Sequence, residues 1–194
     1  MLTGTSSQKA LEGAVLYLLA HSLFKGALFM VAGIIDHETG TRDVTKLGGL
    51  RKAMPITFAA AALAGLSMAG LPPFIGFIAK EVLYYGTWGL SSGALLITAV
   101  AVAGNALMLV IAAAVAIKPF FGPEVHTPKH AHEGPALLWA GPVVLSLTGL
   151  AAALLAHSTG ELFIGPMLSS LMGAQTAVEL HLIPGYISAP LILS

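Results

Sequence analysis

The chain contains no cysteine, which excludes disulfide bonds and thiolate metal ligands. Charged residues make up 9% of the 194 residues, far fewer than an average soluble domain needs to cover its surface. Nine basic and nine acidic residues cancel, so the charge balance does not indicate nucleic acid or another strongly charged partner. A water-soluble fold with so few charges would expose large apolar patches and associate. These shortages favour lipid as the solvent around most of the surface.

Apolar residues reach 56%, and they are arranged in runs long enough to cross a bilayer, which takes about 20 residues. The first run is too long for the apolar part of a signal peptide. The sequence therefore predicts an all-α fold, a polytopic transmembrane helix bundle. We expect residues 1–194 to form a single membrane domain and to be part of a larger protein. The predicted spans are residues 10–35, 55–87, 92–117 and 136–156, with a possible interfacial helix at 161–173.

The second of these spans cannot be one straight helix, because Gly70-Leu71-Pro72-Pro73 lies in its middle. Each proline removes a backbone donor and clashes with the preceding helical turn. The pattern predicts one proline-broken, discontinuous helix interrupted at 70–73. Irregular backbone at membrane depth is tolerated where it lines a cavity or is buried in protein, so the break is a candidate functional region.

Two polar loops indicate the orientation of the bundle. They cover residues 36–53 and 118–135 and hold most of the basic residues: Arg42, Lys46, Arg51, Lys52, Lys118 and Lys129. Short loops rich in Lys and Arg stay in the cytoplasm. We therefore predict both loops on the cytoplasmic side and residues 1–8 on the opposite side.

Ionisable residues occur inside the predicted spans. Tyr17, His21 and Lys25 follow one another at intervals of four, which places them on one stripe of a helix. Lys80 lies beside Glu81 in the second half of the broken span. A lysine at mid-membrane costs at least about 2.5 kcal/mol on insertion scales, and such residues usually face a bundle interior on an ion path.

Each of these residues also has a purely structural interpretation. Lys25 could extend its ammonium to the interface, although it lies near mid-span. His21 could be a packed, hydrogen-bonded histidine, and Lys80 with Glu81 could form an interfacial ion pair. The break just before Lys80 shifts the balance towards function.

The remaining polar residues carry weaker signals. Asn105 predicts a hydrogen bond between two helices. His126, His130 and His132 lie in the second polar loop, where too few other ligands are available for a closed zinc site. We expect this loop to be solvated and to bind no structural metal.

Four blocks of sequence carry a further signal: HSLFKGALFM at 21–30, DHETGTRD at 36–43, LGGLR at 47–51 and GLPPFIGFIAKE at 70–81. Together they resemble the large, A-type subunit of the Mrp-type multisubunit Na⁺/H⁺ antiporters. The histidine–lysine block and the glycine–proline break are shared with the antiporter-like subunits of respiratory complex I. The resemblance is specific through about Tyr85 and looser towards the end of the chain.

The resemblance implies a proton-translocating bundle built from two inverted repeats of five helices, with this chain holding most of the second repeat. It implies that His21 and Lys25 belong to a central hydrophilic axis and that Lys80 is the terminal proton-exchange site, with Tyr17 and Glu81 as possible supporting residues. The glutamate–lysine pair of the first repeat has no counterpart here, so we expect the chain to need the rest of its protein and its partner subunits.

The sequence thus predicts a subunit of a monovalent cation/proton antiporter, in which protons move against Na⁺ or K⁺. This is a multi-pass transporter of the cell membrane rather than an enzyme, with the lipid bilayer and other antiporter subunits as partners and without cofactor or nucleic acid. One alternative is a proton-pumping membrane subunit of NADH–quinone oxidoreductase or a related membrane hydrogenase. Another is a structural membrane scaffold.

Overall fold

The computed structural model describes residues 8–88 and 94–182, and all regular secondary structure in these two ranges is helical. The predicted all-α fold is therefore confirmed. The helices are α1 (Gln8–Thr39), α2 (Pro55–Ala69), α3 (Ile75–Trp88), α4 (Ala94–Ala116), α5 (Ala136–Leu154), α6 (Ala156–Thr159) and α7 (Gly165–Met172).

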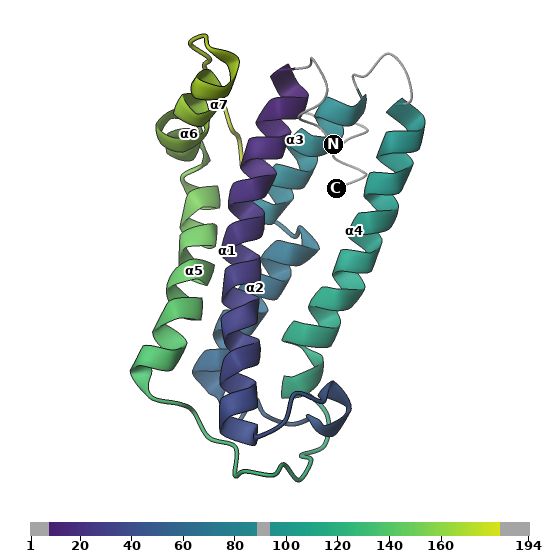
Figure 1. Ribbon diagram of the computed structural model, residues 1–194, viewed down its shortest axis with the longest axis vertical. Helices are drawn as coiled ribbons and strands as arrows, with labels where there is room; N and C mark the ends of the chain where they lie inside the picture. Colours follow the sequence, from purple (N-terminus) through teal and green to yellow (C-terminus); the bar gives the residue numbers. More distant parts are fainter. Residues whose placement is uncertain (1–7, 89–93, 183–194) are drawn as a thin grey trace.

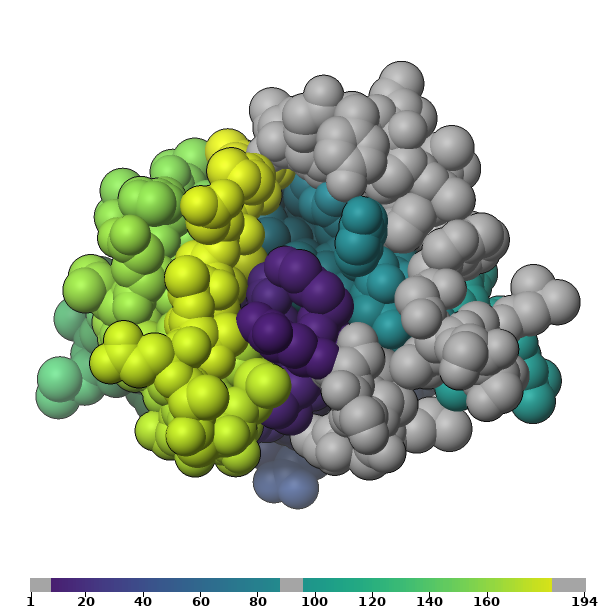
Figure 2. Space-filling view, turned by 90° about the horizontal axis from the view of Figure 1, so that it is seen from above, coloured from purple at the N-terminus to yellow at the C-terminus, as the bar shows by residue number. Residues whose placement is uncertain are grey.

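Helix α1 lies at the centre of an elongated bundle, with α5 on one side and α4 on the other (Figure 1). Helices α2 and α3 follow one another along the bundle behind α1. Seen from the end at which α1 begins, its first turns lie between the C-terminal helical segment and the α3–α4 side (Figure 2). By length and composition, three helices in the described ranges could cross a membrane: Gln8–Thr39, Leu96–Phe120 and Ala136–Leu154.

The predicted break in the second span is confirmed. Helix α2 ends at Ala69, Gly70 takes the left-handed conformation (φ 81°, ψ 33°), and α3 begins at Ile75. The two halves have 15 and 14 residues, and a helix of that length is shorter than the hydrocarbon core of a bilayer, about 30 Å thick. Each half alone is too short to cross, so the end of α2 and the start of α3 meet inside the bundle.

Helices α1 and α3 pack closely because each contributes a glycine that faces the backbone of the other helix. A Cβ on Gly13 would lie 3.0 Å from Cα of Leu83, and a Cβ on Gly86 would lie 2.7 Å from Cα of Ala10. These two contacts define an antiparallel register along the pair. The same register places His21 level with the first residue of α3, and therefore at the depth of the break.

At the end of the bundle where α1 stops and α2 begins, the loop between α4 and α5 is hydrogen-bonded to both helices. The Lys129 amide donates to the carbonyl of Thr39 at 3.0 Å. The Glu133 carboxylate accepts from the amides of Ile56 (2.7 Å) and Thr57 (3.2 Å) at the start of α2. These amides have no partner within the helix, so a distant carboxylate caps the half-helix and complements its positive end.

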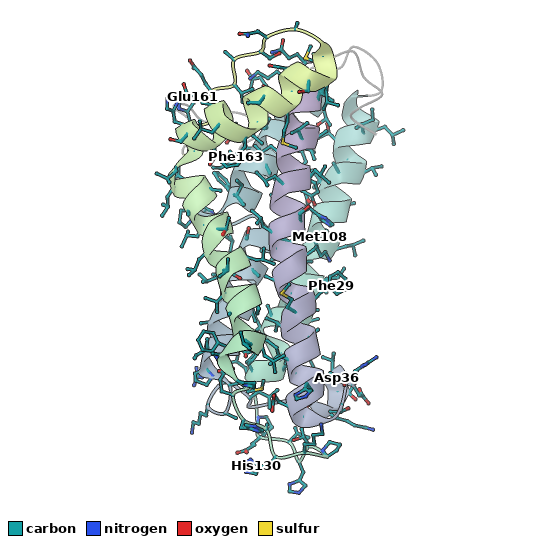
Figure 3. The ribbon with its side chains drawn as sticks, turned by 60° about the vertical axis from the view of Figure 1, so that its left-hand side comes forward. Phe29, Asp36, Met108, His130, Glu161 and Phe163 are labelled. Atoms are coloured by element: carbon teal, nitrogen blue, oxygen red, sulfur yellow. The ribbon has the colours of Figure 1, made fainter. Side chains whose placement is uncertain are left out.

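The chain after α5 folds as one compact helical segment. A π-helical turn, Gly160–Ile164, joins α6 to α7, and α7 ends at Met172, after which Gly173 takes the left-handed conformation. The segment predicted as an interfacial helix therefore consists of this turn and α7. Glu161 and Phe163 lie at one end of the bundle, while Asp36 and His130 lie at the other (Figure 3).

Candidate functional site

Lys80 is buried inside the bundle, with 1% of its surface exposed. Its ammonium donates hydrogen bonds to the carbonyls of Met68 (3.0 Å) and Ala69 (2.8 Å). Both carbonyls belong to the last turn of α2, whose oxygens lack donors within the helix and form the negative end of its dipole. The Lys80 ammonium therefore caps the broken end of α2.

The local sequence explains how Lys80 reaches this position. Long side chains on a helix lean towards its N-terminus, so Lys80 in the second turn of α3 reaches back to the break. Gly70 lies against the lysine stem, and a Cβ there would be 2.6 Å from Lys80 Cδ and 2.8 Å from Nζ. Glycine at this position thus satisfies both the left-handed turn and the space that the lysine needs.

The ends of the two half-helices also touch directly. A Cβ on Gly76 would lie 1.8 Å from the carbonyl oxygen of Ser67, so only glycine lets α3 start this close to the last turn of α2. The Ser67 hydroxyl is buried there and has no hydrogen-bond partner in the described part of the chain. The Met68 and Ala69 carbonyls, which accept the hydrogen bonds of Lys80, therefore lie in a tightly packed contact between the two half-helices.

Glu81 is not the partner of Lys80. Adjacent residues project about 100° apart around a helix, and the half-buried Glu81 carboxylate interacts electrostatically with His181. Because both hydrogen bonds of Lys80 go to main-chain oxygens, the interpretation of the two residues as an ordinary interfacial pair does not describe this site. Among the residues that the structure describes, one of the three N–H groups of the ammonium has no acceptor.

Tyr17, His21 and Lys25 form the predicted stripe on α1, and all three are half-buried. The ring centroids of Tyr17 and His21 lie 6.0 Å apart, and those of His21 and Phe24 lie 5.4 Å apart in an edge-to-face arrangement. Lys25 interacts electrostatically with His21. The stripe lies at the depth of the break, but it does not contribute the hydrogen-bond acceptors of Lys80.

Sequence reasoning missed Tyr84, one helical turn beyond Lys80. Tyr84 is completely buried, and the Asn105 amide of α4 donates a hydrogen bond to its hydroxyl. The prediction that Asn105 joins two helices is thereby confirmed. The only sign in the sequence that Tyr84 belongs to the site was its spacing of four residues from Lys80.

The loop histidines do not gather at one point. His132 contacts the buried carboxylate of Glu38 at 3.2 Å, and His37 contacts it at 2.9 Å, whereas His126 and His130 are exposed. Within residues 8–88 and 94–182 no three His, Asp or Glu side chains are arranged to hold a metal ion. The expectation that the loop binds no structural metal stays a prediction.

The fold and the site define a class: helical membrane proteins with an ionisable residue buried at the break of a discontinuous helix. Residues 1–113 match the transmembrane family of NADH:quinone oxidoreductase and Mrp antiporter proteins, and the chain belongs to this family.

The relatives agree with this family, and those described here are named as Na⁺/H⁺ antiporter subunits or as part of an Mrp complex. The chain is 37% identical over 199 residues to the A1 subunit of the Na⁺/H⁺ antiporter of Staphylococcus epidermidis, covering 94% of this chain and 24% of that protein. It is 34% identical over 196 residues to the protein of the same name in Staphylococcus haemolyticus. A chain in the solved structure of the Mrp complex from Dietzia sp. superimposes with a TM-score of 0.76 at 27% identity, covering 96% of this chain and 20% of that one.

The resemblance seen in the sequence is therefore confirmed. The relatives are named as subunits of transporters, in keeping with the predicted class. The chain spans about a quarter of the length of the curated relatives that it matches.

Proposed function

We propose that this chain is the proton-exchanging part of one subunit of a cation/proton antiporter and that Lys80 takes up and releases the transported proton. The observation that carries the proposal is the hydrogen bonding of the buried Lys80 ammonium to two main-chain carbonyls at the broken end of α2. Carbonyls stabilise an ammonium without the full opposite charge of a carboxylate, which would lock it in the protonated form. A lysine held in this way can exist in both protonation states during a transport cycle.

His21 and Lys25 supply the second part of the proposed proton pathway. They lie on α1 at the depth of the break, where His21 can accept and donate a proton near neutral pH. The gap between this stripe and Lys80 is bridged by water or by the part of the protein that this chain lacks. Tyr17 and Glu81 support the pathway from its edges.

The relatives support a proposal for the transported cation and the partners. Because they are named as Na⁺/H⁺ antiporter subunits and a structural neighbour belongs to an Mrp complex, we assign Na⁺, or K⁺ as the alternative, as the counter-ion. The complete protein acts in the cell membrane together with the other subunits of such a complex. It provides the first repeat that this chain lacks.

The test uses the complete complex reconstituted in vesicles. Lys80→Ala removes the amine, and we expect proton-coupled Na⁺ exchange to be abolished while the amount of assembled complex stays close to wild type. Lys118→Ala, which changes an exposed lysine of the second polar loop, is the matched control and should keep its exchange rate. Full exchange per assembled complex in Lys80→Ala would remove Lys80 from the pathway.

The family also includes subunits of NADH:quinone oxidoreductase, so a proton-pumping membrane subunit is the second candidate function. Copurification separates the two. Small antiporter subunits accompany the full-length protein under our proposal, and redox subunits accompany it under the alternative. If the chain is only a structural scaffold, Lys80→Ala should have the opposite effect. Assembly would be lost, and transport per assembled complex would be unchanged.

A further inference from the structure

A second set of polar side chains lies along the contact between α3 and α4, where Tyr84, Thr87 and Thr98 are buried and Asn105 is half-buried. The Asn105 amide donates to the Tyr84 hydroxyl, and the Thr87 hydroxyl donates to the Tyr84 carbonyl at 3.0 Å. The Thr98 hydroxyl in turn donates to the Thr87 hydroxyl at 3.3 Å. We call Tyr84, Thr87, Thr98 and Asn105 the hydroxyl ladder.

The spacing of these residues places the ladder in line with Lys80. Lys80, Tyr84 and Thr87 stand at intervals of four and three on α3, which puts them on one face of the helix. A tyrosine on a helix leans towards the N-terminus, so the Tyr84 side chain covers the turn that holds Lys80. Thr87 continues the same face to the last turn of α3. Helix α3 stops at the end of the bundle away from the two polar loops (Figure 1).

Helix α4 supports the same conclusion independently. Its 23 residues include only two side chains that can form hydrogen bonds, Thr98 and Asn105. These two are seven residues apart, which puts them on one face, and both contact polar groups of α3. An otherwise apolar helix therefore presents all of its hydrogen-bonding side chains to the ladder.

We propose that the hydroxyl ladder conducts protons between Lys80 and the end of the bundle at which α3 stops, with Tyr84 as the first residue to exchange a proton with Lys80. This inference rests on the proposed function of Lys80. In the step, an N–H bond of the ammonium breaks and an O–H bond forms on the Tyr84 oxygen. The original hydroxyl proton of Tyr84 passes at the same time to a water molecule that leads on to the threonine pair, so the tyrosine stays neutral.

Tyr84→Phe in the complete, vesicle-reconstituted complex is the main test, because phenylalanine keeps the packed ring and removes only the hydroxyl. We expect proton-coupled Na⁺ exchange per assembled complex to fall by about 100-fold, the lower end of the usual range for proton-transfer groups. Tyr85→Phe is the matched control, since Tyr85 is 46% exposed and projects about 100° around the helix from Tyr84, and it should keep its rate. A wild-type rate in Tyr84→Phe overturns the proposal.

A second measurement separates proton transfer from packing. Where proton transfer limits the rate, replacing H₂O by D₂O should slow Tyr84→Phe more than it slows the wild type. A purely structural role of Tyr84 predicts the same ratio of rates in H₂O and D₂O for both proteins. Asn105→Leu should slow exchange in the wild-type background and add nothing in Tyr84→Phe, because both changes act on one hydroxyl. Additive effects of the two changes, with an unchanged isotope ratio, contradict the ladder.

Two further variants keep the outcome clear. If Tyr84→Phe does not assemble, Thr87→Val, which matches threonine in shape, decides in its place, and a wild-type rate there overturns the ladder. Lys80→Ala is measured in parallel. An inactive Lys80→Ala beside a fully active Tyr84→Phe contradicts only the ladder, whereas a fully active Lys80→Ala contradicts the proposed function itself.

Discussion

Gly70 and Lys80 fit against each other so closely that a Cβ on the glycine would lie 2.6 Å from Cδ of the lysine. Gly70 also has a φ of 81°, in the region where a side chain is strained. The turn that ends α2 and the residue that caps it are thus one structural unit, and changing the turn changes where the ammonium can lie.

Gly70→Ala should therefore impair exchange without touching Lys80 chemically. The methyl group displaces the lysine stem from the α2 carbonyls, and the left-handed backbone adds a cost of about 1–2 kcal/mol to the folded state. We expect a lower rate per assembled complex and a lower thermal midpoint. Gly104→Ala is the matched control, because a Cβ there meets no atom within 4 Å. An unchanged rate in Gly70→Ala would show that the close fit has no part in transport.

Glu133 caps the other end of the same half-helix. Its carboxylate accepts from the amides of Ile56 and Thr57 and from the Thr57 hydroxyl at 2.5 Å. Loss of an N-terminal cap costs about 0.5–2 kcal/mol. Glu133→Ala should lower the thermal midpoint of the assembled complex, whereas Glu124→Ala, an exposed carboxylate in the same loop, should not. Equal midpoints for the two variants would contradict the capping role.

The orientation of the bundle can be tested by labelling, since the chain has no cysteine of its own. Thr45 lies in the first polar loop and Ser170 lies in α7, and both are exposed. Thr45→Cys should react with an impermeant thiol reagent only from the cytoplasmic side, and Ser170→Cys only from the opposite side. Labelling of both from one face would mean that the two ends of the bundle do not lie on opposite sides of the membrane. A single crossing by the broken span also predicts that Ser91, which follows it, lies on the outer side, but Ser91 is outside the described residues.

Local chemistry made much of the fold predictable. Two adjacent prolines remove donors and prevent a continuous helix, so the break at 70–73 follows from the sequence. A single asparagine in an apolar span needs a partner, so the interhelical bond of Asn105 also follows. Both inferences need only the residue and its immediate neighbours.

The partners of Lys80 could not be predicted, because they are main-chain carbonyls. Every residue has a carbonyl, and only the three-dimensional course of the break determines which of them lack a donor. The Glu133 cap was equally hidden, since it joins residues more than 70 positions apart. Tyr84 escaped notice because a tyrosine in an apolar run is more often a packing residue than a polar one.

Lys80→Arg tests the central claim most directly. Arginine keeps the positive charge and the hydrogen-bond donors that cap α2, but it does not release a proton at physiological pH. The measurement is proton-coupled Na⁺ exchange by the complete complex in vesicles, divided by the amount of assembled complex. Our account predicts near-normal assembly and a loss of exchange similar to that of Lys80→Ala. Exchange at the wild-type rate in Lys80→Arg would show that Lys80 acts only as a fixed charge on the broken helix.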